Sequence, residues 1–388
     1  MHRARGVRDD HRGGGLNKLA TNIGVIGCGD ILDAYLIGLS RFGKSAEVLR
    51  VADVELDRAE SAAERHAVPA WGGVDELWAD EEIGLVVSLT PPIFHHEIIK
   101  RAAAVGKDVY TEKPLSATTK LAQDALAAAE ASKIIVGSAP DTYLGSAAQT
   151  ARAAIDRGDI GDVIGVVAFA PYNRAERRHP NPGFLFQAGA GPLLDIPPYH
   201  LSWLIHLLGP LGTVSGLSRK SADVRRIPAA DGSAVEVPVE VDTHVTSIME
   251  FASGVVGTFI GSFDVWSHRL PAIEIYASLG AMSLPHPNWY DGPVEIRLHD
   301  DEAWTELEPI FAPIQLEPTE KVRGLGVVDL IEAREGKPHR TNGSFAFHVL
   351  EVLEAMQAAS NRRAYVDIES RPDRPAPLDP HDMERWRS

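Results

Sequence analysis

The chain has 388 residues, 44% of them hydrophobic and 24% charged, a balance typical of a globular protein with room for more than one domain core. Its formal net charge of −16 argues against nucleic acid and membrane surfaces as partners, because an acidic surface repels phosphate groups. The single cysteine, Cys28, excludes an intramolecular disulfide and a cysteine-based zinc cluster, and it fits a reducing, cytoplasmic location.

The first 20 residues, MHRARGVRDDHRGGGLNKLA, are charged and rich in glycine. They lack the apolar core of a secretory signal, and no apolar run in the chain reaches the roughly 18 residues that a membrane helix needs. We therefore expect residues 1–20 to be a disordered extension or the product of a mis-called start site. A basic arm that touches a neighbouring subunit is the alternative.

Residues 21–140 alternate between short apolar runs and helical segments. The predicted strands are NIGVIG, VLRVADV, IGLVVSL, KDVYT and KIIVG, and the predicted helices are ILDAYLIGLSRF, DRAESAAERHA, FHHEIIKRAAA and LAQDALAAAEA. This alternation predicts a doubly wound parallel α/β sheet, a Rossmann dinucleotide-binding domain. Its ligand should lie at the carboxyl ends of the strands.

The pattern changes in residues 141–366, where a helix, a strand and a short helix (LGSAAQTARAAIDRG, DVIGVVAFA, YHLSWLIHLLG) precede a series of strands. These strands are VTSIMEFASG, VVGTFIGSFDV, AIEIYASLG, GAMSL and VEIRLHD. Serial strands joined by tight turns predict an α+β domain with a large, mostly antiparallel sheet. A late helix near 344–358 could pack back on the first domain, and residues 367–388 form a Pro-rich tail that we expect to be irregular.

A glycine turn joins the first predicted strand to the first helix. Glycine lets the backbone approach a pyrophosphate closely, and the helix N-terminus offers N–H groups and a positive dipole end. Leu32 replaces the third glycine of the common fingerprint, so an ordinary strand-to-helix turn is an equal alternative. The predicted cofactor-binding residues of this loop are Gly27, Cys28, Gly29, Asp30 and Ile31.

Asp53 ends the second predicted strand, roughly 20 residues after the turn, as the dinucleotide fingerprint expects. A carboxylate there accepts hydrogen bonds from the adenosine ribose hydroxyls and repels a 2′-phosphate, which favours NAD over NADP. A plain strand-terminating aspartate is the alternative, and nearby Arg58 leaves room for both cofactors.

Glu112, Lys113 and Pro114 follow the predicted strand KDVYT directly. The residue before a proline is pushed towards extended geometry, so Lys113 should project from the strand end into the crevice expected to hold the nicotinamide. A solvated lysine at the edge of the sheet is the plain alternative.

From Asn22 to about Val366 the chain resembles the Gfo/Idh/MocA oxidoreductases, named for glucose–fructose oxidoreductase and inositol dehydrogenase. The segments GVIGCGDI, LTPPIFHHE, EKP and GAGPLLDIPPYHL carry the resemblance. It implies that Lys113 and Asp195 are the catalytic pair. It also implies an NAD-dependent dehydrogenase that moves a hydride between nicotinamide and a secondary hydroxyl of a sugar, glycoside or cyclitol.

The general base stays open between two neighbouring residues. Relatives often carry a histidine four residues after the aspartate, whereas here Tyr199 takes that place and His200 follows it. Alignment favours Tyr199, because some sugar-oxidising relatives have tyrosine there, and intrinsic pKa favours His200. Cationic Lys113 should stabilise a developing alkoxide, and burial should lower the pKa of Lys113 enough for it to share in proton transfer.

Further site positions follow from the resemblance and from the predicted fold. Core packing is the alternative to substrate binding for Tyr143 and Trp266. For His179 the alternative is a place on a solvent-facing loop. The chain shows no His or Cys spacing typical of a metal site, so we expect no metal. The cofactor-binding set is completed by Thr90, Pro91, His95, Glu112 and Lys113, and the expected substrate-binding residues are Tyr143, His179, Trp266 and His268.

The resemblance also implies a small polyol or sugar as partner and a homodimer or homotetramer formed through the exposed face of the C-terminal sheet. Two other function classes stay open. One is an NAD-using glycosidase or lyase that oxidises its substrate transiently, with no net redox change. The other is a non-catalytic dinucleotide-binding sensor.

Overall fold

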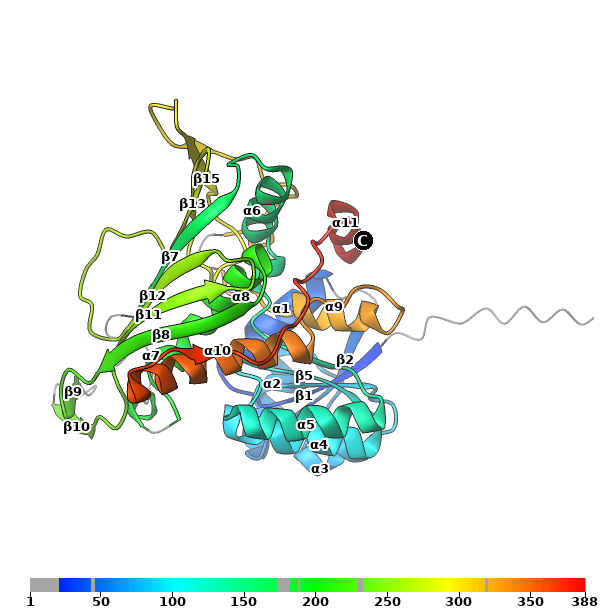
Figure 1. Ribbon diagram of the computed structural model, residues 1–388. Helices are drawn as coiled ribbons and strands as arrows, with labels where there is room; N and C mark the ends of the chain where they lie inside the picture. Colours follow the sequence, from blue (N-terminus) through cyan, green and yellow to red (C-terminus); the bar gives the residue numbers. More distant parts are fainter. Residues whose placement is uncertain are drawn as a thin grey trace, which may run out of the picture.

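The computed structural model describes residues 21–42, 46–172, 182–187, 189–228, 233–317 and 320–387. Within these ranges the chain forms a six-stranded parallel sheet and a nine-stranded mixed sheet, which lie next to each other (Figure 1). The predicted fold class is thereby confirmed: a doubly wound α/β half is followed by an α+β half with a mostly antiparallel sheet.

The parallel sheet has the strand order β3-β2-β1-β4-β5-β6. Helices α1 and α2 contribute to the core on one face, and helices α3, α4 and α5 to a second core on the other. Because both faces are covered, β4 is buried along its whole length, which accounts for its nearly continuous apolar sequence. The elements are β1 (Thr21–Ile26), α1 (Leu32–Phe42), β2 (Ala46–Ala52), α2 (Leu56–His66), β3 (Ala70–Gly72), α3 (Val74–Ala79), β4 (Leu85–Ser88), η1 (Pro92–Phe94), α4 (His95–Val105), β5 (Asp108–Thr111), α5 (Thr119–Ser132) and β6 (Val136–Ser138).

The second sheet has the order β16-β15-β14-β13-β7-β12-β11-β8-β17. Its described strands pair antiparallel except β7 and β12, which run parallel. The strands are β7 (Val163–Pro171), β8 (Leu211–Arg219), β11 (His244–Phe251), β12 (Val256–Ser262), β13 (Ile273–Ala277), β14 (Gly280–Leu284), β15 (Glu295–Leu298), β16 (Thr305–Glu306) and β17 (Val366–Asp367), with a separate hairpin of β9 (Val224–Pro228) and β10 (Ala234–Pro238).

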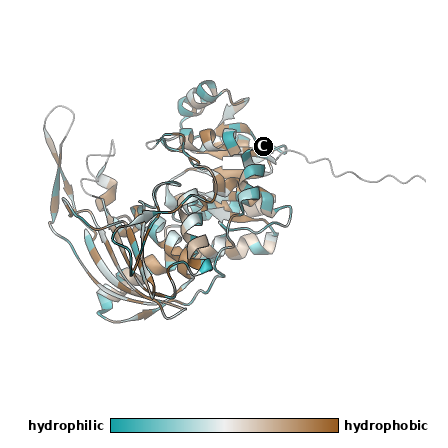
Figure 2. Cartoon of the chain, turned by 90° about the horizontal axis from the view of Figure 1, so that it is seen from above, coloured by the Kyte–Doolittle hydropathy of each residue, from teal (hydrophilic) through white to brown (hydrophobic). Residues whose placement is uncertain are grey.

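The helices of this half pack on one face of the mixed sheet, where α6, α7, α8 and α10 contact its strands. Figure 2 shows hydrophobic residues along the strands of both sheets, so the packed faces form the core. No helix in the described ranges has the length and apolar character needed to cross a membrane. The helical segments are η2 (Thr142–Leu144), α6 (Ser146–Arg157), η4 (Pro182–Phe186), α7 (Pro192–Asp195), α8 (Pro197–Leu208), α9 (Leu325–Ala333), α10 (Gly343–Arg362) and α11 (Pro380–Arg387).

Helix α10 connects the two sheets. It packs against β8 of the mixed sheet and against α5 and β6 of the parallel sheet (Figure 1). The Asn342 side chain caps its N-terminus by accepting a hydrogen bond from Phe345 N at 2.9 Å. Glu354, farther along the helix, accepts from Thr119 N at 2.9 Å and from its hydroxyl at 2.6 Å, so α10 also ties down the start of α5.

The expectation of an irregular tail is wrong for its last residues, which form helix α11. Pro380 is compatible with the first turn of a helix, because its missing N–H would be unpaired there in any case. Met383 and Trp386, three residues apart on one face, are 1% and 3% exposed. The apolar face that they form packs the end of the chain against α1.

Candidate active site

The glycine turn after β1 leaves space for a ligand where the fingerprint expects a pyrophosphate. Gly27 has φ +100°, and a Cβ there would lie 2.9 Å from the backbone of Leu89, so only glycine fits. At Gly29 a Cβ would meet no atom within 4 Å. This open space beside the N-terminus of α1 suits the close approach of a phosphate group.

Asp53 lies directly beside this turn. One carboxylate oxygen accepts from Cys28 N at 2.8 Å and the other from Glu55 N at 2.9 Å, and the residue is 8% exposed. Burial, followed by the charge of Asp53, raises the pKa of the Cys28 thiol to about 11, so the thiol is neutral and donates to Ala52 O at 3.7 Å. Asp30 is exposed and Ile31 half-buried at the same turn. The residues present therefore fit a dinucleotide.

The loop after β4 is fixed to the loop after β5 by a buried histidine. His95 is fully buried, with Nδ1 2.8 Å from Pro114 O and Nε2 2.9 Å from Thr90 O. Thr90 also shares a hydrogen bond with Ser88 through their hydroxyls at 2.9 Å. The structure thus gives His95 a positioning role between the two loops, and Thr90 and Pro91 lie at the carboxyl end of β4.

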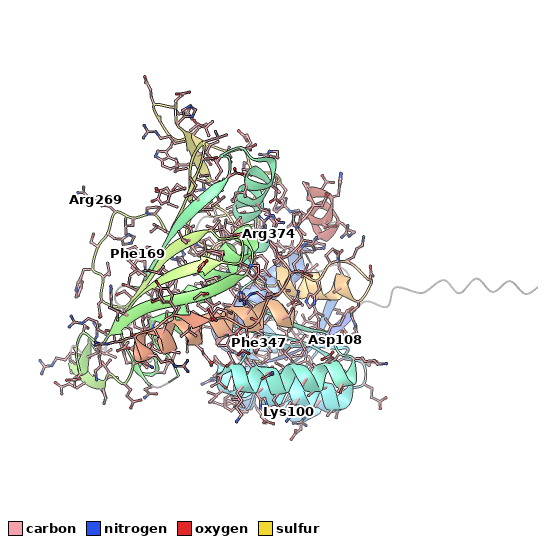
Figure 3. The ribbon with its side chains drawn as sticks, viewed as in Figure 1. Lys100, Asp108, Phe169, Arg269, Phe347 and Arg374 are labelled. Atoms are coloured by element: carbon pink, nitrogen blue, oxygen red, sulfur yellow. The ribbon has the colours of Figure 1, made fainter. Side chains whose placement is uncertain are left out.

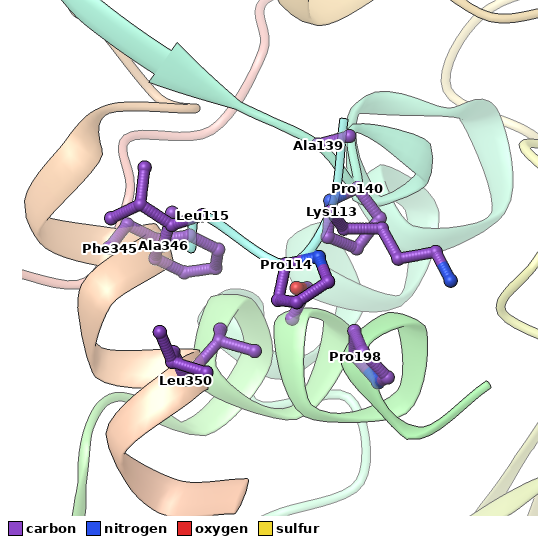
Figure 4. A pocket seen from close by; sticks show the side chains of 11 residues that line it. Lys113, Pro114, Leu115, Ala139, Pro140, Pro198, Phe345, Ala346 and Leu350 are labelled. Carbon is purple, nitrogen blue, oxygen red and sulfur yellow. The ribbon is translucent and has the colours of Figure 1, made fainter. Parts of the chain in front are cut away.

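Lys113 and Asp195 meet although 82 positions separate them in the chain. Lys113 Nζ donates to the backbone oxygen of Asp195 at 2.7 Å and lies 3.6 Å from its Oδ1. A small cavity of about 10 Å³ lies behind this segment, with apolar walls that include Leu115, Ala346 and Leu350. Figure 4 shows the Lys113 side chain extending away from those walls, so its ammonium points to Asp195 rather than into the apolar packing.

The expected lowering of the Lys113 pKa is wrong. Burial, the largest single effect, does lower the pKa of this ammonium. Tyr199, Asp195 and Glu112 together outweigh burial, and the net result is a pKa above the usual 10.5. Lys113 is therefore a cation at neutral pH, a hydrogen-bond donor and electrostatic stabiliser rather than a neutral base.

Tyr199 and His200 point in different directions, because consecutive residues of a helix are about 100° apart. Lys113 Nζ lies 5.5 Å from the centroid of the Tyr199 ring. The His200 ring instead packs edge-on against Phe259 of β12 and against His286. Burial and the nearby His286 lower the pKa of His200 to about 3, so His200 is a neutral core residue directed away from Lys113.

Glu112 anchors the loop after β5 to helix α1. Its Oε1 accepts from the Tyr35 hydroxyl at 2.8 Å, and its Oε2 accepts from Lys113 N at 2.9 Å. Both carboxylate oxygens thus serve to hold the backbone of the lysine in place.

The three expected substrate-binding residues that the structure describes are not gathered around Lys113 and Asp195. Tyr143 is fully buried, donates its hydroxyl to Arg340 O at 2.9 Å and packs against Phe345, which matches its core-packing alternative. Trp266 is 68% exposed, so it is not the buried strand-edge residue that the alternative foresaw. His179 falls outside the described residues.

His268 lies on the far side of the mixed sheet. Its ring packs edge-on against Phe169, 4.8 Å between centroids, and Figure 3 labels Phe169 on β7. The neighbours Ala168 and Ala170 belong to the core that includes α8, and successive side chains of a strand point to opposite faces. Phe169 and His268 are therefore on the face away from Tyr199.

A buried polar cluster beside Tyr199 was missed by the sequence analysis. Arg323, 7% exposed, lies with its guanidinium carbon 5.7 Å from the centroid of the Tyr199 ring and 5.9 Å from that of Tyr290. Asp141, which follows β6, accepts from the backbone N–H groups that flank Leu325. The one available signal was an arginine inside the short apolar segment VRGLG, which no motif marks.

Across the described ranges, no three His, Cys, Asp or Glu side chains gather in a way that could hold a metal ion. The chemistry available at the site is that of a cation, Lys113, an adjoining carboxylate, Asp195, and a phenol, Tyr199, close to a dinucleotide-type turn. Such a set can stabilise an alkoxide and move a proton.

Two family models match the chain. The model described as "Oxidoreductase family, NAD-binding Rossmann fold" matches residues 21–139, and the model "GFO/IDH/MocA C-terminal domain" matches residues 148–283. The first match identifies the parallel sheet as an NAD-binding Rossmann domain, in agreement with the predicted cofactor. The first match covers the parallel sheet, and the second covers the mixed sheet from β7 through β13 and most of β14.

The chain is also similar to individual proteins of known name. The chain is 26% identical over 280 residues to trans-1,2-dihydrobenzene-1,2-diol dehydrogenase of Mus musculus, covering 72% of this chain and 78% of the relative. It is 29% identical over 219 residues to dTDP-3,4-didehydro-2,6-dideoxy-alpha-D-glucose 3-reductase of Streptomyces violaceoruber, covering 56% and 62%.

In fold, the chain is similar to levoglucosan dehydrogenase in complex with NADH and L-sorbose. The TM-score is 0.78 at 19% identity, over 90% of this chain and 99% of the other.

Proposed function

Because the chain belongs to the Gfo/Idh/MocA family of NAD(P)-dependent oxidoreductases, we propose that it moves a hydride between nicotinamide and a secondary hydroxyl of a sugar, glycoside or cyclitol. The proposal places Lys113 and Asp195 at the reacting hydroxyl. The observation that carries it is the contact of Lys113 Nζ with both the backbone oxygen and the carboxylate of Asp195, beside the carboxyl end of β5.

In the oxidative direction each residue has a distinct task. Lys113, held cationic, donates a hydrogen bond to the substrate oxygen and stabilises the alkoxide as it forms. Asp195 orients the ammonium and the hydroxyl, and the Tyr199 oxygen receives the hydroxyl proton. Bound NAD supplies the hydride acceptor, to which the electron pair of the carbinol C–H bond passes as the C=O bond forms.

NAD is the proposed cofactor in preference to NADP. The Asp53 carboxylate is held by two backbone N–H groups at the end of β2, where the ribose hydroxyls of a dinucleotide are expected. Its negative charge there would repel a 2′-phosphate. A dissociation constant for NADP at or below that for NAD would contradict this preference.

The names of the relatives support the substrate class. The mouse relative is named for a cyclic diol, the bacterial relative for a deoxysugar, and the structural neighbour for levoglucosan. We carry over only what these names share, a ring that bears oxygen functions. We further propose a cytoplasmic homo-oligomer, a dimer or tetramer, that associates through the open face of the mixed sheet.

A screen of sugars, glycosides and inositols for NADH formation tests the proposal. Wild-type protein should reduce NAD with at least one of them, and Lys113→Met should lower kcat by about 10²–10³-fold, the loss typical of removing one charge-stabilising donor. Lys100→Met, which changes an exposed lysine on α4 (Figure 3), is the matched control and should keep full activity.

Three outcomes would contradict the proposal. Normal turnover by Lys113→Met would remove the lysine from the mechanism. Products of cleavage or elimination without accumulated NADH would indicate a lyase or glycosidase. Binding of NAD with no reaction on the whole panel would indicate a sensor.

A further inference from the structure

Arg323 is a buried cation without a contacting carboxylate. Its hydrogen bonds go to neutral oxygens: Val322 O at 2.7 Å, Asn288 O at 3.1 Å and Asn288 Oδ1 at 2.7 Å. Among the described residues, no acidic group lies within ion-pair distance of its guanidinium. Burial disfavours this charge, but the fields of its neighbours outweigh burial and hold the pKa of Arg323 above its usual value. The cation is thus stabilised through space rather than by an ion pair.

A second buried arginine, Arg340, provides the contrast. It is 3% exposed and pairs with Asp329 and Asp382, each at 2.9 Å. That arrangement is what a purely structural buried arginine requires. Arg323 departs from it and instead directs its charge at aromatic rings.

The backbone around Arg323 is fixed on two sides. Arg323 N donates to Ala34 O of α1 at 2.9 Å, and a Cβ on Gly38 would lie 1.7 Å from Arg323 O, so α1 packs directly on this backbone. On the other side, the Asp141 carboxylate accepts from Gly324 N at 3.1 Å and from Gly326 N at 2.9 Å. The position of the guanidinium is therefore set before any substrate binds.

Arg323 and Lys113 converge on the same tyrosine. The electrostatic neighbours of Lys113 are Tyr199, Asp195 and Glu112. Those of Arg323 are Tyr199, Tyr290, Asp141 and Glu112. Tyr199 and Glu112 occur in both groups, and Glu112 is already engaged by the Tyr35 hydroxyl and by Lys113 N. Both cations thus lie beside the Tyr199 ring, with Lys113 Nζ 5.5 Å and the Arg323 guanidinium carbon 5.7 Å from its centroid.

We propose that Arg323 is a positioning residue for the oxidation: a fixed second cation that orients Tyr199 and favours the negative charge on its oxygen. The inference rests on the proposed function. Tyr199 releases its proton to solvent, and its oxygen then takes the proton of the substrate hydroxyl while the carbinol hydride leaves for the cofactor. Arg323 exchanges no proton and lowers the free energy of the charged state through its field.

The pH profile of kcat/KM tests this role. In Arg323→Met the acid limb should move to higher pH by about one unit, so that the rate near neutral pH falls about tenfold and recovers in more alkaline solution. Arg323→Lys keeps the charge and should keep most of the wild-type profile. If instead the rate of Arg323→Met drops by one factor at every pH, the residue is merely structural and the proposal is overturned.

A spectroscopic titration separates this inference from the proposed function. Ultraviolet difference absorbance follows tyrosine ionisation in the holoprotein without substrate. The contribution of Tyr199 is the part of the signal that is absent in Tyr199→Phe. That signal should move to higher pH in Arg323→Met, and an unmoved signal overturns the proposal.

A moved signal in a protein that oxidises no sugar supports the role of Arg323 and refutes only the assigned reaction. If Arg323→Met fails to fold, Arg323→Gln takes its place, since Gln can still reach the neutral acceptors without the charge.

Discussion

At the scale of single residues, the protonation states of two side chains bear on the proposed chemistry. Lys113 is held as a cation because its anionic neighbours and Tyr199 outweigh the effect of burial on its pKa. His200, one position from Tyr199, is held neutral by burial at a pKa of about 3. A cationic donor and an inert neighbour therefore follow from environment rather than from residue type.

The lowered pKa of His200 predicts a pH-dependent loss of stability. In the unfolded chain His200 binds a proton below its usual pKa of 6.5, whereas in the folded chain it binds that proton only near pH 3. Between these two values wild-type protein should lose roughly 1.4 kcal/mol of unfolding free energy per pH unit relative to His200→Phe. Urea unfolding at several pH values measures the difference.

The control for this measurement is His299→Gln, which alters an exposed histidine and should follow the wild-type curve. Parallel curves for wild type and His200→Phe would show that the His200 environment is not as the structure has it.

At the scale of elements, the site is assembled from loops at the carboxyl ends of parallel strands. Asp53 accepts from Cys28 N of the β1–α1 turn, and His95 bonds to carbonyl oxygens of the loops after β4 and β5. Glu112 accepts from the Tyr35 hydroxyl of α1 and from Lys113 N. The second half contributes α7, α8 and the segment before α9. The side chains of the candidate site thus come from several separate segments of the chain.

The two glycines of the β1–α1 turn make a matched pair. Gly27→Ala should cost about 1–3 kcal/mol of unfolding free energy, because alanine would be strained at φ +100° and would press on the Leu89 backbone. Gly29→Ala meets no protein atom and should leave stability within about 0.5 kcal/mol. It should nevertheless weaken NAD binding, because the methyl group enters the space proposed for the pyrophosphate.

Urea unfolding and isothermal calorimetry with NAD check both variants. Unchanged NAD affinity in Gly29→Ala would mean that the dinucleotide does not lie against this turn.

At the scale of the whole molecule, the two halves are joined by segments that follow the second sheet in the chain. Helix α10 contacts both sheets, and α11 returns to α1 of the first half. Arg340 joins α9 to α11, because it pairs with Asp329 of α9 and with Asp382 of α11. These contacts hold together the two halves that contribute Lys113 and Arg323.

The open face of the mixed sheet predicts self-association. Ile248 is 53% exposed and Leu217 63% exposed, while their neighbour Met249 is in the core. An exposed apolar sheet face of this kind is typical of a protein interface. Ile248→Arg should shift the protein to a smaller species in light scattering after size exclusion. Val105→Arg, on the outer helix α4, should not, and a monomeric wild type would refute the interface.

Local patterns in the sequence determined the two-part fold, the glycine turn and Asp53, because hydrophobic period and glycine conformation act between neighbours in the chain. The pairing of Lys113 with Asp195 was implied by the family resemblance, and their contact is a property of the tertiary structure. The local patterns did not predict β8, because its sequence LGTVSGLSR consists mostly of small and polar residues. They also did not predict α11, which is stabilised by its contact with α1. Only the tertiary structure decided that Tyr199 faces Lys113 while His200 faces the sheet, since that depends on how α8 is rotated against its surroundings. The same holds for Arg323, whose place beside Tyr199 arises from long-range packing that no stretch of sequence records.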